Sequence, residues 1–80
     1  MIHLKDIIYE SGIIRCFYSP EKCGEYGYIE YDVEKNLILN LEQTKYDNNK
    51  QFYYQNVKNR LKSFCKDKNN IPSEYNLIIF

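Results

Sequence analysis

Residues 49–67 constrain the fold more than any other part of the chain, because their apolar side chains recur with the period of a helix. At about 100° per residue, these side chains fall within about 120° of arc, the width of a core-facing stripe. They are Tyr53, Tyr54, Val57, Leu61, Phe64 and Cys65. The pattern predicts one long amphipathic helix that packs against the rest of the protein.

Polar residues and a proline mark the expected ends of this helix. Asn48 and Gln51 resemble a capping box, in which side chains satisfy the free backbone N–H groups of the first turn. Asn69 and Asn70 are suited to a left-handed C-cap, and Pro72 prevents the helix from continuing.

Apolar runs on both sides of the predicted helix indicate β-strands. Two strands are expected within residues 4–18, joined by a turn at Glu10-Ser11-Gly12, where glycine can adopt a positive φ. Residues 26–32 and 37–42 predict a hairpin, because both runs alternate and a polar turn separates them. The segment 75–80 is apolar on both faces, so a buried strand is expected, either central in the sheet or covered by a partner.

Alternation within the strands predicts which face of the sheet is apolar. Within residues 13–18, the charge of Arg15 favours the face of Ile13, Arg15 and Phe17 as the solvent side, and the opposite assignment, with Ile14, Cys16 and Tyr18 outward, stays open. In the hairpin, alternate residues of both strands are expected to form one apolar side under the helix. These residues are Ile29, Tyr31, Leu37, Leu39 and Leu41.

Together the elements predict an α+β fold in a single small domain over residues 1–80, without a linker or a second domain. The expected order is β-β-β-β-α-β. It gives a mostly antiparallel sheet of four to five strands, with the helix of about residues 49–67 packed on one face. A chain of 80 residues has one core and little room for a deep internal cleft.

Composition indicates a cellular setting. The chain lacks alanine and tryptophan but is rich in isoleucine, asparagine, lysine and tyrosine, which suggests AT-rich coding DNA and a bacterial or phage origin. Three cysteines without a C-x-x-C pair are typical of reduced thiols, so a cytoplasmic protein is expected. No signal peptide is expected, because residues 1–10 contain acidic residues and no apolar h-region. No membrane span is expected, because no apolar run approaches ~20 residues. The single His3 gives no basis for a zinc site, and neither a metal nor another cofactor is expected.

Charge is distributed unevenly, and the predicted helix has a basic back. Residues 1–47 carry five basic and nine acidic side chains, whereas residues 48–80 carry six basic and two acidic ones. On the helix, Lys58, Lys62 and Lys66 recur at every turn, with Arg60 beside them, a spacing suited to successive phosphates of a nucleic acid. A solvated helix surface explains the same pattern. The pI of about 6.6 favours that explanation, because nucleic-acid-binding domains are usually strongly basic.

No group of residues has the pattern of a catalytic site, so we expect that the protein is not an enzyme. Two acidic pairs flank turns: Asp32 with Glu34, and Glu21 with Glu25. Such positions suit turn formation better than acid–base catalysis, which needs burial to tune a pKa. Cys23 is the thiol expected to be exposed, but the sequence around it offers no base and no orienting residue.

Tyrosine is the most unusual feature of the composition, with nine in 80 residues. A core under one helix needs fewer, so several are expected on the sheet face that the helix leaves open. These are Tyr9, Tyr18, Tyr26 and Tyr28, together with Phe17. Aromatic side chains dominate the energetics of protein interfaces. Tyrosines that pair across strands and keep their hydroxyls hydrated explain the same abundance without a partner.

Tyr26, Tyr28 and Ile38 are the candidate protein-interaction face. We therefore expect a small binding or regulatory accessory protein that acts through protein–protein contacts or self-association. A homodimer through this face or through a strand edge is the leading expectation. Nucleic-acid binding through Lys58, Lys62 and Lys66 is the alternative.

Overall fold

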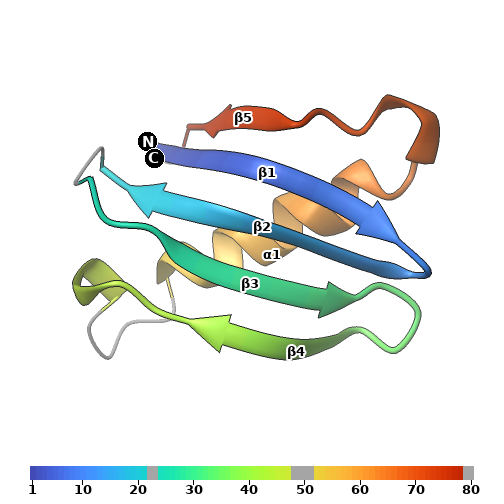
Figure 1. The fold of residues 1–80 in the computed structure, drawn as a ribbon, viewed down its shortest axis with the longest axis horizontal. Coiled ribbons are helices and arrows are strands. Elements are labelled where there is room, and N and C mark those ends of the chain that lie inside the picture. The colour runs from blue at the N-terminus through green and yellow to red at the C-terminus, as the bar shows by residue number, and fades with distance from the viewer. Residues whose placement is uncertain (22–23, 48–51, 79–80) are drawn as a thin grey trace.

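The computed structural model describes residues 1–21, 24–47 and 52–78, which form a five-stranded sheet with one α-helix behind it (Figure 1). The strands are β1 (Ile2–Glu10), β2 (Ile13–Pro20), β3 (Gly27–Asp32), β4 (Leu37–Glu42) and β5 (Glu74–Leu77), and the α-helix is α1 (Phe52–Phe64). The sheet order is β4-β3-β2-β1-β5, and all four strand pairings are antiparallel. The predicted α+β class and element order are confirmed.

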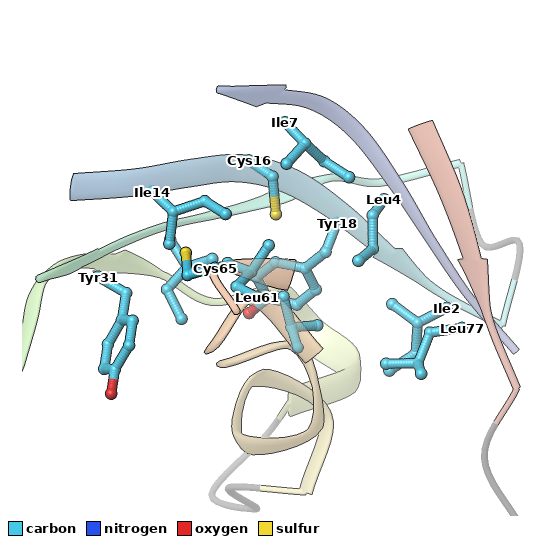
Figure 2. Packing of buried hydrophobic residues seen from close by; sticks show 12 residues of the cluster. Ile2, Leu4, Ile7, Ile14, Cys16, Tyr18, Tyr31, Leu61, Cys65 and Leu77 are labelled. Carbon is cyan, nitrogen blue, oxygen red and sulfur yellow. The ribbon is translucent and has the colours of Figure 1, made fainter. Parts of the chain in front are cut away.

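The core lies between α1 and one face of the sheet, because α1 packs against β1, β2 and β3 (Figure 1). Val57 and Leu61 of α1 are fully buried, and the nearby Cys65 is almost so. They meet side chains from four strands (Figure 2), namely Ile2, Leu4, Ile7, Ile14, Cys16, Tyr18, Ile29, Tyr31 and Leu77. Tyr53, Tyr54 and Phe64 pack around this cluster, which confirms the predicted helical stripe.

The C-terminal end of α1 differs from the prediction. The helix stops at Phe64, and residues 68–70 form a short 3-10 turn in which neither Asn69 nor Asn70 has a positive φ. The carboxylate of Asp67 caps this turn: its oxygens accept from the Asn69 backbone N–H at 3.3 Å and from the Asn70 side-chain amide at 2.7 Å. An Asp that bonds to nearby backbone competes with helix continuation. The expected capping box of Asn48 and Gln51 lies outside the described residues.

The pairing of β3 with β4 corrects the prediction of one leucine face. Ile29 pairs with Leu41 and Tyr31 with Ile38, so β4 contains one extra residue between those pairs. The resulting bulge reverses the alternation, because a shift of one residue moves side chains to the opposite face. Leu37 and Leu39 are therefore 52% and 46% exposed, and Ile38 packs against the core in their place.

The last strand is at the edge of the sheet, so the expectation of a central position is wrong. Within the described ranges, β5 pairs with β1 alone, and the other side of β1 is occupied by β2. Leu77 at the end of β5 is buried, whereas the next residue, Ile78, is 63% exposed. Residues 79–80 lie outside the described residues.

A bulge in β1 decides which of its side chains reach the solvent face. Lys5 pairs with Phe17 and Ile8 pairs with Arg15, so between these pairs β1 contains one residue more than β2. Asp6, in this bulge, has a φ of 53°. The Ile7 N–H donates to the Ser73 carbonyl at 3.0 Å. Because the bulge absorbs one residue, Ile7 points into the core and Ile8 points away from it, where it is 41% exposed.

Tyr18 belongs to the core, contrary to the prediction that it reaches the open face. It is fully buried among the core side chains (Figure 2), and its hydroxyl donates to Asp47 Oδ2 at 2.7 Å. The Thr44 backbone N–H donates to the same oxygen at 3.0 Å. Burial, and then the hydrogen bond to Asp47, raise the pKa of Tyr18 well above its usual range. This network attaches the 3-10 turn Lys45–Asp47 to the sheet.

Candidate functional site

The sheet face opposite α1 is the candidate functional site, and it is built by alternate residues of the strands. On β2, Arg15 and Phe17 point away from the core, as predicted from the charge of Arg15. The register places Ile8 of β1 and Glu30 of β3 beside Arg15, and it places Tyr28 of β3 beside Phe17. These side chains share the open face, because directly paired residues of neighbouring strands point to the same side.

A shallow hollow of about 590 Å³ lies on this face, with an apolar floor and a charged rim. Its apolar side chains include Ile8, Phe17 and Tyr28, and the rings of Phe17 and Tyr28 are 5.0 Å apart between centroids. Ile8 is 41% exposed and Phe17 38% exposed. Asp6, Arg15 and Glu42 also line the hollow, as do Ile7 and Ser73.

Hydrogen bonding holds the Tyr28 ring in place at the floor of the hollow. Its hydroxyl donates to Glu30 Oε2 at 2.5 Å. Burial, followed by this hydrogen bond, raises the pKa of Tyr28, while the nearby Arg15 guanidinium lowers it in part. The phenol therefore stays neutral at physiological pH, and its ring presents a fixed apolar surface next to Phe17.

A second cluster lies on the open face around Tyr26, which is 39% exposed. The Lys5 ammonium is 4.1 Å from the centre of the Tyr26 ring, a cation–π geometry. The His3 ring meets Tyr26 edge-on at 6.2 Å between centroids, and its Nδ1 lies 3.0 Å from Asn76 Oδ1. His3, Tyr26 and Asn76 line a smaller hollow of about 330 Å³, together with Ser19 and Gly24.

The structure divides the residues that were predicted for this face. Tyr26 and Tyr28 lie on it, but Ile38 lies on the core side of β4, because the β3–β4 bulge reverses the alternation there. Tyr9 also packs against the core, where the Lys68 ammonium lies 5.3 Å from its ring centre. Ile8 is the important residue that the prediction missed. The pair Ile7-Ile8 is apolar at both positions, so alternation alone does not identify the outward residue.

The basic back of the helix is only partly organised as predicted. Lys62 and Lys66 are exposed, Lys58 and Arg60 are half-buried, and Lys66 lies beyond the last residue of α1. The Arg60 guanidinium carbon is 5.3 Å from the centre of the Tyr75 ring, so this side chain is engaged within the protein. Lys58 and Lys62 remain as a pair one helical turn apart.

The open sheet face and helix α1 carry opposite net charges. The register assigns five acids and two bases to the open face, a net charge of −3: Glu10, Glu30, Asp32, Glu42 and Glu74 against Lys5 and Arg15. The sequence of α1 contains three basic residues and no acid, a net charge of +3. The uneven charge along the sequence therefore becomes a charge difference between two surfaces.

The carboxylates considered for catalysis make local contacts. Asp32 accepts from the Lys35 backbone N–H at 3.0 Å, and Glu21 pairs with the amino group of Met1 at 3.2 Å. Burial raises the pKa of the Cys16 thiol to about 12, which keeps it protonated. Cys23 lies outside the described residues. Within residues 1–21, 24–47 and 52–78, no group of three or more His, Cys, Asp or Glu side chains is arranged to hold a metal ion.

Comparison of the chain with protein-family models, with curated protein sequences and with solved structures gives no match. In the described part of the chain, no helix has the length and apolar character needed to cross a membrane. The functional proposal therefore depends on the chemistry of the chain's own residues.

Proposed function

We propose that this protein is a small non-enzymatic binding or regulatory accessory protein that binds a protein partner through its open sheet face. The observation that carries the proposal is the hollow formed by Ile8, Phe17 and Tyr28. Its apolar residues lie on the three middle strands, and α1 covers the opposite face. Clustered apolar and aromatic side chains inside a polar rim are typical of interaction sites.

The site is suited to binding because its main side chains are already held in place. Tyr28 is fixed by Glu30 and by the Phe17 ring, so little side-chain entropy is lost when a partner covers it. Ile8 has few rotamers because it is β-branched. Free, buried thiols at Cys16 and Cys65 support a reducing compartment, and we place the protein in the cytoplasm.

Site-specific photo-crosslinking in the expressing cells tests this proposal. A photoreactive phenylalanine analogue replaces Phe17 on the open face in one variant and Lys62 on the helix back in the other. The proposal predicts a discrete crosslinked protein product from position 17 and none from position 62. The absence of a product at position 17, in cells where the variant is folded and abundant, would refute it.

A second copy of the chain is the other protein partner that the open face could bind. Sedimentation velocity at two concentrations in the micromolar range, for the wild type and for Tyr28→Lys, tests this form of the proposal. Self-association through the face predicts a dimer in the wild type and a monomer in the variant. A wild type that stays monomeric throughout excludes it and leaves a different protein as the partner.

Nucleic-acid binding through the helix back is the second candidate, favoured by the absence of acidic residues in α1. Lys58 and Lys62 would contact phosphates, so affinity must fall steeply with salt concentration. A salt-titrated mobility shift compares Lys58→Glu/Lys62→Glu with a matched reversal elsewhere, Lys35→Glu/Lys45→Glu. Loss of binding in the first pair alone supports the candidate, and equal binding by both pairs excludes the helix as the site.

A further inference from the structure

We infer that the partner of the open face is a cationic, amphipathic segment of another protein, an inference that rests on the proposed function. The segment places an apolar side chain in the hollow between Ile8, Phe17 and Tyr28. Its lysine or arginine side chains face the acids around that hollow. The volume of about 590 Å³ is enough for more than one large side chain.

Acidic side chains surround the apolar floor. Asp6 and Glu42 both line the hollow, and Arg15 is the one base among the described residues that line it. The register places Arg15 directly across from the acidic Glu30, which offsets part of its charge. The excess of acids over bases extends across the whole open face. Complementary charge favours a cationic segment and disfavours an anionic one.

A second copy of this chain fits the same face poorly. A symmetric contact between two open faces brings a net charge of −3 against an equal one, which costs free energy. A contact between the open face of one copy and the basic back of α1 in another copy would match in charge but would not supply an apolar group for the hollow. Val57 and Leu61 of α1 are buried in the core, and its exposed Phe52, 48% accessible, lies in the first turn of the helix, more than one turn away from Lys58 and Lys62. A separate segment supplies both the charge and the apolar group.

Fluorescence anisotropy with two labelled decapeptides tests the inference. One peptide alternates lysine with leucine, and its counterpart alternates glutamate with leucine. The wild-type protein is expected to bind the lysine peptide at least about tenfold more tightly than the glutamate peptide, with an affinity that falls as salt is added.

Two matched pairs of variants locate the binding. Ile8→Asp and Leu39→Asp add the same negative charge at side chains of similar exposure, 41% and 46%, but only Ile8 lines the hollow. If charge alone determined the affinity, both variants would bind the lysine peptide more tightly than the wild type. The inference predicts about tenfold weaker binding for Ile8→Asp and no weakening for Leu39→Asp. Glu42→Gln should weaken binding about threefold, whereas Glu34→Gln, outside the hollow, should not.

Equal binding of the two peptides, or unchanged affinity in Ile8→Asp, overturns the inference. A wild-type dimer that Ile8→Asp dissociates also overturns it, because the occupant is then a second copy. Failure of the proposed function gives a different result. If crosslinks from position 17 identify a partner segment without basic residues, this inference fails and the proposed function stands. If position 17 gives no crosslink, both fail.

Discussion

Gly27→Ala should strongly destabilise the protein, although alanine is normally preferred to glycine in a strand. Gly27 of β3 lies opposite Tyr18 of β2. An added Cβ would be 2.6 Å from Tyr18 Cζ and 2.6 Å from the Glu42 carbonyl oxygen, closer than folded proteins tolerate. Neither atom can move freely, because Tyr18 is fully buried and bonded to Asp47, and the carbonyl belongs to the backbone of β4.

The size of the effect follows from these contacts. Overpacking a closely packed core costs about 1–3 kcal/mol. Displacing the Tyr18 ring also breaks its hydrogen bond to the Asp47 carboxylate, worth about 1.5–3 kcal/mol. The entropic gain of alanine over glycine returns about 0.5–1 kcal/mol. The expected net loss is therefore about 1.5–5.5 kcal/mol, a large share of the stability of a domain of this size.

Urea unfolding followed by far-UV circular dichroism measures this loss, with an expected fall in the midpoint of about 1 M or more. Gly24→Ala is the matched control. Gly24 has a φ of +80°, but among the described residues nothing lies within 4 Å of an added Cβ there. This control therefore reports the backbone penalty alone, about 1–2 kcal/mol. The packing argument is refuted if Gly27→Ala is as stable as the wild type, or if it is more stable than Gly24→Ala.

Three further predictions address the core, the β4 register and the dependence on pH. Leu61→Ala should cost about 2–5 kcal/mol, because it leaves a cavity under the sheet, and an unchanged urea midpoint would contradict the packing. Ile38→Asp should lower the urea midpoint clearly, whereas Leu39→Asp should shift the unfolding free energy by no more than about 0.5 kcal/mol; the reverse order would contradict the bulge. Burial raises the folded-state pKa of both Cys16, to about 12, and Tyr18. Their stabilisation is present below the unfolded pKa values of about 8.5 and 10 and is lost as pH rises, so unfolding free energy measured from pH 8 to 12 should fall. Cys16→Ala should flatten that slope, and an equal slope would contradict the assignment.

Much of the fold could be predicted because its signals are local. The helical stripe around Val57 and Leu61 repeats within one element. In β2, alternation leaves both faces open, and the charge of Arg15 favours the side that is exposed in the structure. The parts that could not be predicted depend on how strands pair. The bulge at Asp6 and the extra residue in β4 change side-chain direction without a distinctive sequence mark.

The candidate site shows the same division. Tyr26 and Tyr28 were predicted on the open face and lie there. Ile38 lies on the core side and Ile8 lies on the open face, because each is next to a bulge that alternation does not reveal. Tyr18 could not be assigned to the core from its own strand, since its burial depends on Gly27 in a neighbouring strand and on Asp47 in a distant turn.

The location of binding is the central claim, and amide chemical-shift mapping tests it most directly. The ¹⁵N-labelled protein is titrated with the lysine–leucine decapeptide used above. The account predicts that the largest shifts cluster at Ile8, Phe17 and Tyr28, with little change in Phe52–Phe64. Shifts that are largest in α1, or that spread evenly over all acidic residues, would contradict it.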